Sequence, residues 1–130
     1  MSENESASDN KSILLREDSN GICTLPLNRP EKRNALSSDL LTALQEAFDE
    51  LADDKSIKVI ILAANGPVFS SGHDLNEVRT DSSYAVMHAL FEQCSDVMIT
   101  MKKQPQPIIA KVHGTAMAAG CQLMANCDLA

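Results

Sequence analysis

Basic residues are scarce in this sequence. Its 130 residues contain 11 Lys and Arg against 18 Asp and Glu, which gives a formal net charge of −7 at pH 7. Proteins that bind nucleic acid gain much of their affinity from Lys and Arg side chains that neutralise phosphates, so this balance argues against a nucleic-acid partner. It also excludes a basic helix lying on a membrane surface.

Long uncharged segments are missing as well. The longest run without Asp, Glu, Lys or Arg extends from Val112 to Cys127, is shorter than a bilayer span and contains polar residues. We therefore expect no insertion into a membrane. The N-terminal MSENESASDN has acidic residues, no base and no apolar stretch, unlike a mitochondrial transit peptide or a secretory signal. We expect residues 1–11 to form a disordered acidic tail and the protein to be cytoplasmic.

Closely spaced cysteine pairs are also absent. The 4 cysteines form no Cys-x-x-Cys pair and have no metal-finger spacing with the 3 histidines. Neither a zinc site nor a disulfide framework is indicated. We expect no metal site and four reduced, mostly buried thiols, at Cys23, Cys94, Cys121 and Cys127.

The length and the patterning predict one α/β domain. A chain of 130 residues is long enough for one hydrophobic core and too short for two. Beyond the tail, residues 12–130 alternate between strand-like and helix-like patterns, which is typical of a mostly parallel sheet with flanking helices.

The individual elements follow from turn signals and apolar periodicity. Asn20-Gly21 predicts a hairpin turn between two short strands. Apolar residues at helical period predict two main helices, and short β-branched runs predict strands buried on both faces. The expected strands are residues 12–16, 21–27, 57–64 and 108–112, with a further strand opening at 128–130. The expected helices are 37–54, 82–103 and 116–125, with a short one opening after 71–75.

Two loops that follow the buried-type strands consist mainly of small residues. They are residues 69–74, FSSGHD, and residues 114–121, GTAMAAGC. Small side chains let a ligand approach backbone N–H groups, and the N–H groups of a helix's first turn lack partners within the helix. Two such donors converging on one oxygen form an oxyanion hole, typically worth about 10²- to 10³-fold in rate per donor. Tight packing of helices on the sheet also needs small residues, and spacing alone favours that simpler explanation.

The order of the motifs resembles a known family. NRPEKRNAL, KVIILAANGPVFSSGHDL and PIIAKVHGTAMAAGCQLMANCDLA, with helices between them, are similar to the enoyl-CoA hydratase/isomerase, or crotonase, family. FSSGHDL and AAGCQL together are most similar to one subgroup of it. The resemblance covers about residues 12–130. It implies the N-terminal portion of a crotonase-like domain, which is a superhelix of ββα units, and predicts that the domain is truncated in this chain.

The resemblance also implies a site for acyl-CoA. In the family, two peptide N–H groups bind the thioester oxygen and stabilise an enolate, and the matching groups are those of His73 and Ala119. Coenzyme A enters as part of the substrate, so no separate cofactor is implied. For Arg29, Lys32 and Arg33, a solvated charged loop explains the residues as well as a phosphate contact does. The substrate-binding residues implied are Lys32, Arg33, Ala35, Leu36, His73, Asp74, Leu75, Asn76 and Ala119.

The sequence departs from the family at the catalytic carboxylates. The first catalytic Glu of the family's GGGCE pattern is matched by Gln122, whose amide cannot exchange a proton at neutral pH. The second lies beyond the position of Ala130. Three functions stay open: a hydratase or isomerase using another carboxylate in a longer parent, a non-catalytic acyl-CoA-binding or regulatory protein, and an inactive fragment. For a full-length parent the resemblance implies a homotrimer or hexamer.

Other reactive side chains have simpler interpretations. Asp74 is expected to cap a helix rather than to act as an acid. The imidazole of His73 is expected to be partly exposed without a proton-transfer role. We expect His113 to make a structural hydrogen bond and His88 to lie on the surface.

Overall fold

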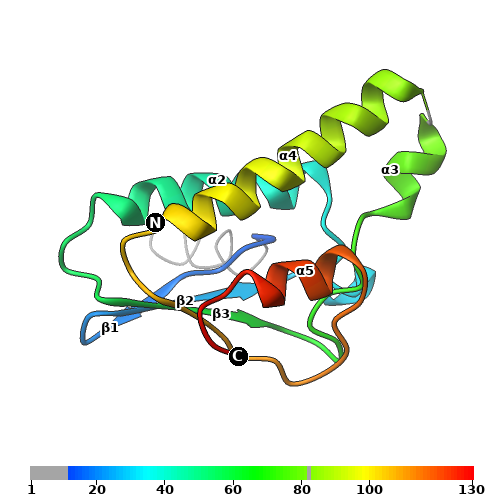
Figure 1. Ribbon diagram of the computed structural model, residues 1–130. Coiled ribbons are helices and arrows are strands. Elements are labelled where there is room, and N and C mark those ends of the chain that lie inside the picture. The colour runs from blue at the N-terminus through cyan, green and yellow to red at the C-terminus, as the bar shows by residue number, and fades with distance from the viewer. Residues whose placement is uncertain (1–11, 82) are drawn as a thin grey trace, which may run out of the picture.

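The structure is a computed structural model that describes residues 12–81 and 83–130. The predicted tail, residues 1–11, lies outside the described residues. The order of strands and helices confirms the predicted α/β class (Figure 1). The elements are β1 (Glu17–Ser19), β2 (Ile22–Leu27), the 3-10 helix η1 (Pro30–Lys32), α2 (Ser38–Ala52), β3 (Val59–Ala64), α3 (Leu75–Thr80), α4 (Tyr84–Lys103), β4 (Ile108–Ala110) and α5 (Ala119–Ala125).

The four strands form one sheet in the order β1-β2-β3-β4. The pair β1–β2 is antiparallel, whereas β2–β3 and β3–β4 are parallel, which confirms a mostly parallel sheet. Helix α2 connects β2 to β3, and helices α3 and α4 connect β3 to β4. Because parallel strands end at the same edge of a sheet, the loops after β2, β3 and β4 lie near one another.

The first hairpin is shorter than predicted. Strand β1 pairs residues 17–19 with residues 22–24, while the predicted strand at residues 12–16 contributes only an isolated bridge from Leu14 to Leu27. Asn20 and Gly21 have φ angles of 53° and 80°, as a two-residue hairpin turn of type I′ requires. The turn therefore lies where predicted, and it pairs the residues that flank it directly.

Several predicted boundaries move inwards. Strand β4 ends at Ala110, and the predicted strand at residues 128–130 is an isolated bridge between Ile109 and Leu129. Helix α4 begins at Tyr84, after Ser83 caps it by accepting a hydrogen bond from the N–H of Val86.

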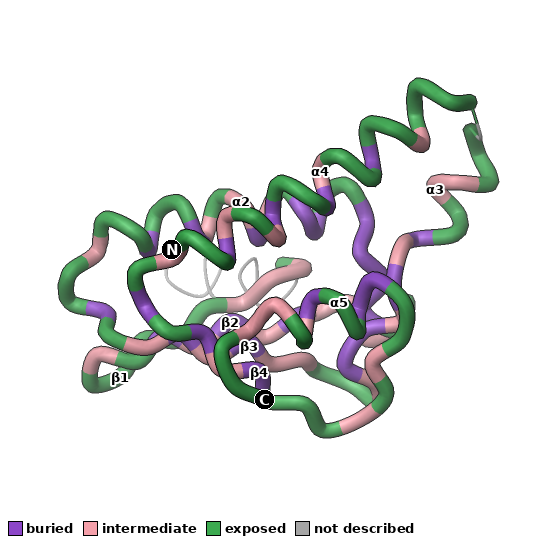
Figure 2. The backbone as a smooth tube through the Cα atoms, viewed as in Figure 1, coloured by how far each residue is buried: buried purple, intermediate pink, exposed green. Residues whose placement is uncertain are grey.

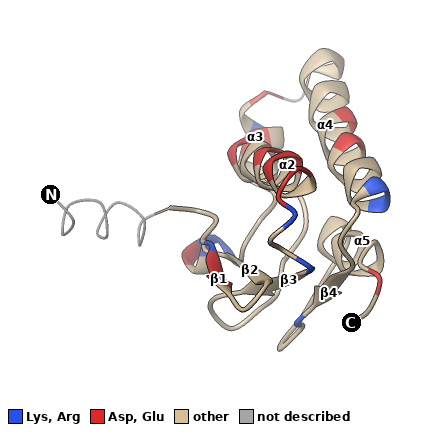
Figure 3. Cartoon of the chain, turned by 90° about the vertical axis from the view of Figure 1, so that its left-hand side faces the viewer, with Lys and Arg blue, Asp and Glu red and all other residues tan. Residues whose placement is uncertain are grey.

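The strands are buried on one face only, which corrects the prediction of burial on both. Ile60 and Leu62 in β3 have no exposed surface, whereas Val59 and Ile61, which alternate with them, are half-buried. The same alternation runs along β2, where Ile22 is 39% exposed. Helices α2 and α4 lie over one side of the sheet, and the described residues place no comparable pair of helices over the other (Figures 1 and 3).

The hydrophobic core lies between this covered face and the two helices. Because α2 and α4 present apolar residues at helical period, each buries a stripe against the sheet. The stripe is Leu40, Leu41, Leu44, Phe48 and Leu51 in α2, and Leu90, Cys94, Val97 and Met101 in α4.

The N-terminal part of α4 extends past the body of the molecule together with α3, and most of it is exposed (Figure 2). Val86 lies in this part of α4 and is consequently 39% exposed, although it is one helical turn before the buried Leu90. No helix in the described ranges is long and apolar enough to cross a bilayer.

The cysteines are free, but only two of them are buried. Cys23 and Cys94 lie in the core, Cys127 is half-buried and Cys121 is exposed on α5. The expectation of mostly buried thiols is therefore wrong for Cys121.

Candidate functional site

The two loops of small residues meet at Gly72. This residue has a φ of 101°, and a side chain added there would place its Cβ 3.2 Å from Ala118 Cβ and 3.4 Å from Ala119 N. Glycine is the residue that accepts both this conformation and this close approach. The structure therefore brings the peptide groups of His73 and Ala119, which come from loops after different strands, to one place.

Both of these peptide N–H groups lack a hydrogen-bond acceptor among the described residues. Their directions are set by the carbonyl groups of the same peptides, because N–H and C=O point in opposite directions in a trans peptide. The carbonyl of Gly72 accepts from Leu36 N at 2.7 Å, so the His73 N–H faces away from Leu36. The carbonyl of Ala118 accepts from Gln122 N at 3.1 Å, so the Ala119 N–H points out of the N-terminal end of α5.

Ser70 holds the loops in this arrangement. It is fully buried, and its Oγ donates to the carbonyl of Asn34 at 2.9 Å and accepts from Gly72 N at 3.3 Å. The carbonyl of Ser70 accepts from Met117 N at 3.0 Å. One residue thus links the loop before α2, the loop after β3 and the loop before α5. We did not predict this role, although a serine directly after the apolar Val68-Phe69 pair is a signal for it.

Asn34 makes a second buried link. Its Nδ2 donates to the carbonyls of Asn65, at 2.8 Å, and Val68, at 3.1 Å, and its Oδ1 accepts from Arg29 N at 2.8 Å. Its φ of 52° lies in the left-handed region, which Asn tolerates better than most residues. This conformation turns the loop that follows η1 back towards β3.

A cleft of about 250 Å³ lies beside His73. Seven of the nine substrate-binding residues implied by the resemblance line it, together with Ser71, which was not predicted. The other two do not: Leu36 has no exposed surface and Ala119 is 4% exposed. Leu36 contributes the backbone N–H that orients the Gly72–His73 peptide, and its contact with a ligand stays a prediction. The lining residues are Lys32, Arg33, Ala35, Ser71, His73, Asp74, Leu75 and Asn76.

Asp74 caps α3, as predicted. Its Oδ1 accepts from Asn76 N at 2.9 Å, and its Oδ2 lies 3.3 Å from Nη2 of Arg29. The two side chains are only 11% and 15% exposed, so this is a largely buried ion pair. Arg29 is thus neither solvated nor free for a phosphate, whereas Lys32 and Arg33 are exposed. Both carboxylate oxygens of Asp74 therefore have partners within the protein.

The imidazole of His73 packs edge-on against Phe91, with ring centroids 4.9 Å apart and an interplanar angle of 78°. Partial burial lowers the pKa of His73, which favours the neutral ring at pH 7. Its Nδ1 is buried and has no partner within the part of the chain that the structure describes. Phe91 was not predicted to lie near the site, because it falls outside the apolar stripe of α4.

The other histidines behave as predicted. Nε2 of His113 is hydrogen-bonded to the carbonyl of Gly66 at the turn after β3, which is a structural role. His88 lies exposed on α4, where its Nδ1 is 3.5 Å from a carboxylate oxygen of Glu92.

The two carboxylates that follow His73 closely in the sequence, those of Asp74 and Glu77, both accept hydrogen bonds from backbone N–H groups. The carboxylate of Glu77 accepts from Ser38 N at 3.0 and 3.2 Å, at the start of α2. Gln122 is exposed on α5, one turn beyond Ala119, and its side-chain amide makes no hydrogen bond to the described residues. No group of three or more His, Cys, Asp or Glu in residues 12–81 and 83–130 is placed to hold a metal ion.

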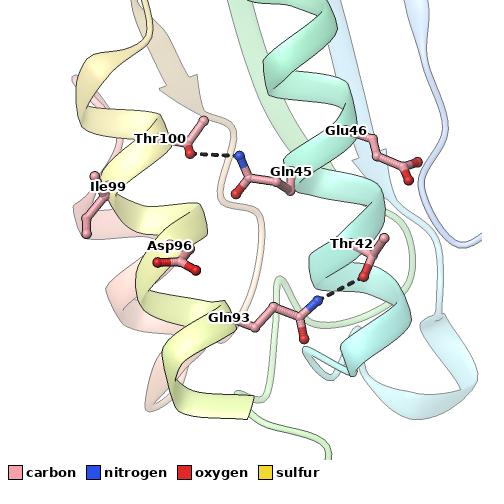
Figure 4. Close-up of a pocket in the computed structure, with 7 residues that line it drawn as sticks. All are labelled: Thr42, Gln45, Glu46, Gln93, Asp96, Ile99 and Thr100. Atoms are coloured by element: carbon pink, nitrogen blue, oxygen red, sulfur yellow. Dashed lines mark hydrogen bonds between the residues drawn. The ribbon is translucent and has the colours of Figure 1, made fainter. Parts of the chain in front are cut away.

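A second groove, of about 420 Å³, runs between α2 and α4 (Figure 4). Gln45 reaches across it to Thr100 Oγ1, and Gln93 reaches to Thr42 Oγ1, each at 2.8 Å. Both helices carry acidic residues (Figure 3). Because its polar groups join the helices to each other, we assign the candidate site to the cleft beside His73.

The chain belongs to the enoyl-CoA hydratase/isomerase family, whose model matches residues 17–130. The human mitochondrial enoyl-CoA hydratase domain-containing protein 3 is 48% identical over 110 residues, which are 85% of this chain and 36% of that protein. The zebrafish protein of the same name is 46% identical over 122 residues, 94% of this chain and 42% of its own. The 2,3-dehydroadipyl-CoA hydratase of Escherichia coli is 35% identical over 108 residues, 83% of this chain and 41% of that enzyme.

Solved structures share the fold. An enoyl-CoA hydratase from Mycobacterium smegmatis superposes with a TM-score of 0.89 at 50% identity, covering 92% of this chain and 47% of that chain. The human enoyl-CoA hydratase domain-containing protein 3 superposes with a TM-score of 0.86 at 44% identity, covering 90% of this chain and 46% of that chain. The family resemblance and the crotonase-like fold are therefore confirmed.

The chain spans less than half the length of the relatives it matches. The human and zebrafish relatives carry the word mitochondrial in their names. This gives no support to our expectation of a cytoplasmic protein, which stays a prediction. The residues on which that expectation depends, 1–11, lie outside the described part of the chain.

Proposed function

We propose that this chain binds acyl-CoA in the cleft beside His73 and polarises the thioester carbonyl with the N–H groups of His73 and Ala119. The observation that carries the proposal is the meeting of these two groups at Gly72, both without an acceptor among the described residues. Two fixed donors stabilise the negative charge that develops on a thioester oxygen as an enolate forms. The name of the Escherichia coli relative, a hydratase of a CoA thioester, supports this ligand class.

The cleft offers suitable surroundings for such a ligand. Lys32 and Arg33 are exposed on one wall and supply positive charge for the phosphates of coenzyme A. Leu75 on the other wall is 71% exposed and offers apolar surface next to the donors. The ligand would therefore lie between the loop before α2 and the loop after β3.

The reaction that follows polarisation needs a proton acceptor. Asp74 and Glu77 are engaged in caps and an ion pair, and Gln122 carries an amide where the family has a glutamate. We therefore expect the residues described here to bind and polarise without hydrating. A hydratase or isomerase reaction would use a carboxylate elsewhere in a longer parent, and a non-catalytic acyl-CoA-binding role is the second candidate.

Matched ligands test the donors without altering the protein. Acetyl-CoA contains the thioester oxygen, whereas S-ethyl-CoA is a thioether that lacks it. Two hydrogen bonds of about 1 kcal/mol each predict that acetyl-CoA binds about 30-fold more tightly. Isothermal titration calorimetry measures both affinities, and equal affinities would contradict the proposed site.

A matched pair of variants tests one donor in the protein. Ala119 is the first residue of α5, a position at which proline is tolerated because its missing N–H has no helical partner. Ala119→Pro should lower the preference for acetyl-CoA over S-ethyl-CoA by about 5-fold, the loss of one bond of about 1 kcal/mol. Ala119→Gly retains the N–H and should keep the preference, and thermal unfolding of both variants shows whether they stay folded.

Turnover separates the two candidate functions. Loss of the enoyl-thioester absorbance of crotonyl-CoA reports hydration. A chain that binds acetyl-CoA with the predicted preference but leaves crotonyl-CoA unchanged fits polarisation without a base. Hydration by this chain would show that a proton acceptor other than the engaged carboxylates operates.

A further inference from the structure

We infer that Arg29 strengthens the His73 N–H as a hydrogen-bond donor by acting through two intervening peptide groups. Arg29 would then be a positioning residue for the carbonyl-binding site, an inference that rests on the function proposed above. The sequence predicted a solvated charge or a phosphate contact for Arg29. In the structure its guanidinium instead contacts Asp74 and the carbonyl of Ala35.

The relay consists of two hydrogen bonds and two peptide groups. Nη1 of Arg29 donates to the carbonyl of Ala35 at 3.0 Å. The other side of that peptide is the N–H of Leu36, which donates to the carbonyl of Gly72 at 2.7 Å. The other side of the second peptide is the N–H of His73, which has no acceptor among the described residues. Because both peptides are trans, all the donors point the same way.

This alignment places a positive charge behind the free N–H. Hydrogen bonds arranged in series polarise one another, by about 10–30% per bond in condensed phases. The path is shielded from water, because Ala35 is 7% exposed, Leu36 has no exposed surface and Gly72 is buried. The Arg29 side chain is only 15% exposed, so the field of its guanidinium is weakly screened.

Asp74 opposes this effect. Its Oδ2 lies 3.3 Å from Nη2 of Arg29 and partly neutralises the guanidinium. Its Oδ1 meanwhile caps α3 through Asn76 N. An asparagine at this position can still cap the helix, because Asn and Asp are similarly good N-caps. Asp74→Asn therefore removes the negative charge and keeps the local structure.

The Ala119 N–H provides an internal control. Its peptide carbonyl accepts from Gln122 N within α5, so its orientation comes from the helix and not from Arg29. Any effect that travels through the relay should appear at His73 and not at Ala119.

The ligand-free test measures amide proton chemical shifts of the full chain by NMR. Weaker polarisation in Arg29→Gln should move the His73 amide proton upfield, and removal of the opposing charge in Asp74→Asn should move it downfield. The Ala119 amide should not move in either variant. Arg16→Gln, which removes an exposed ion-paired arginine remote from the cleft, should move neither amide.

A purely structural role predicts a different pattern. Both Arg29→Gln and Asp74→Asn break the same ion pair, so a loosened loop would move the His73 amide in the same direction in both. That result, or equal movement of His73 and Ala119, would overturn the relay. If Arg29→Gln does not fold, Asp74→Asn decides alone, because it retains the guanidinium and must shift the amide downfield.

The carbonyl stretch of bound [1-¹³C]acetyl-CoA, measured by infrared difference spectroscopy, extends the test to the ligand. Binding to the wild-type chain should lower the frequency, and Arg29→Gln should reduce this shift by about 10–30%. A wild-type shift that Arg29→Gln leaves unchanged would overturn the relay and retain the proposed function. No shift in the wild-type chain, with the amide pattern intact, would contradict the proposed function and retain the relay.

Discussion

Ala118 occupies a backbone conformation that suits glycine. Its φ of 49° and ψ of −122° place the last residue before α5 in a region that L-residues with a side chain rarely adopt. The family pattern has glycine here, and this chain has alanine. This strained residue directly precedes Ala119, so Ala118 is one of the residues that determine where the Ala119 N–H points.

Replacing this alanine should stabilise the protein. Ala118→Gly relieves about 1–2 kcal/mol of backbone strain and costs about 0.5–1 kcal/mol in unfolded-chain entropy. We expect the free energy of unfolding to rise by about 0.5–1 kcal/mol, measured by urea denaturation. The matched control is Ala89→Gly in the middle of α4, which should lower it by about 0.5–1 kcal/mol. A lower free energy of unfolding in both variants would show that Ala118 is not strained.

His73 makes stability depend on pH. Its folded-state pKa is lowered by burial, so as the pH falls through the unfolded value of about 6.5 the unfolded chain takes up a proton first. Stability should therefore decrease from pH 7 towards pH 5.5 and stop decreasing below the folded-state pKa.

Thermal unfolding of two histidine variants at these pH values isolates this contribution. His73→Gln should lose less stability on acidification than the wild-type chain. His88→Gln, at an exposed position, should lose as much as the wild type. Equal losses in all three proteins would contradict the assignment to His73.

At the scale of elements, helices and turns followed from the sequence more faithfully than strand ends. The apolar period of α2 predicted its buried stripe, and Asn20-Gly21 predicted the hairpin turn. The ends of β1 and β4 depend on which residues find partners across the sheet, and no local pattern specifies that. The same limit applies to the site: small-residue loops were visible in the sequence, but the contact between Gly72 and Ala119 joins segments that only the fold brings together.

The sequence also did not predict roles that depend on which residues are buried. Leu36 and Arg29 belong to a motif that resembles a ligand-binding loop. This motif predicts a ligand contact for Leu36 and a solvated charge or a phosphate contact for Arg29. In the structure Leu36 has no exposed surface and Arg29 is paired with Asp74. The backbone N–H of Leu36 holds Gly72, and the side chain of Arg29 holds Asp74, so both residues support residues of the site without facing solvent.

Helices α2 and α4 are joined by polar side chains as well as by their apolar stripes. Gln93 Nε2 donates to the carbonyl of Ser38 at 3.0 Å and to Thr42 Oγ1 at 2.8 Å, and Ser38 Oγ donates to Gln93 Oε1 at 3.0 Å. Gln93→Ala should lower the free energy of unfolding by about 1–2 kcal/mol, because each bond contributes about 0.5–1.5 kcal/mol and alanine recovers part of this as helix propensity. Urea denaturation measures the loss.

The control for this prediction is Ser95→Ala, two residues further along α4 at an exposed position. It should change the free energy of unfolding by less than about 0.5 kcal/mol. A comparable loss in both variants would show that the cross-helix bonds do not stabilise the packing of α2 on α4.

The whole molecule has a sheet with one covered and one partly open face. Ile22 is 39% exposed on the open face, and Val59, which pairs with it on β3, is half-buried. Apolar surface of this kind favours association. We expect sedimentation velocity to show that the average mass rises with protein concentration.

Two threonine substitutions test whether the open face is responsible. Ile22→Thr retains a β-branched shape and should weaken the association. Ile99→Thr changes an apolar residue that is 51% exposed on α4 and should leave the association unchanged. A monomer at all concentrations, or an equal effect of both variants, would contradict a role for the sheet face.

The candidate site is assembled from three loops that are far apart along the chain. The hydrogen bond from Leu36 to Gly72 and that from Met117 to Ser70 each close a long loop, and the parallel pairs β2–β3 and β3–β4 do the same. Contacts between distant segments form late and slow the folding reaction. The carbonyl-binding geometry should therefore arise only near the end of folding, so the onset of acetyl-CoA binding during refolding would time the final docking of α5 against the loop at Gly72.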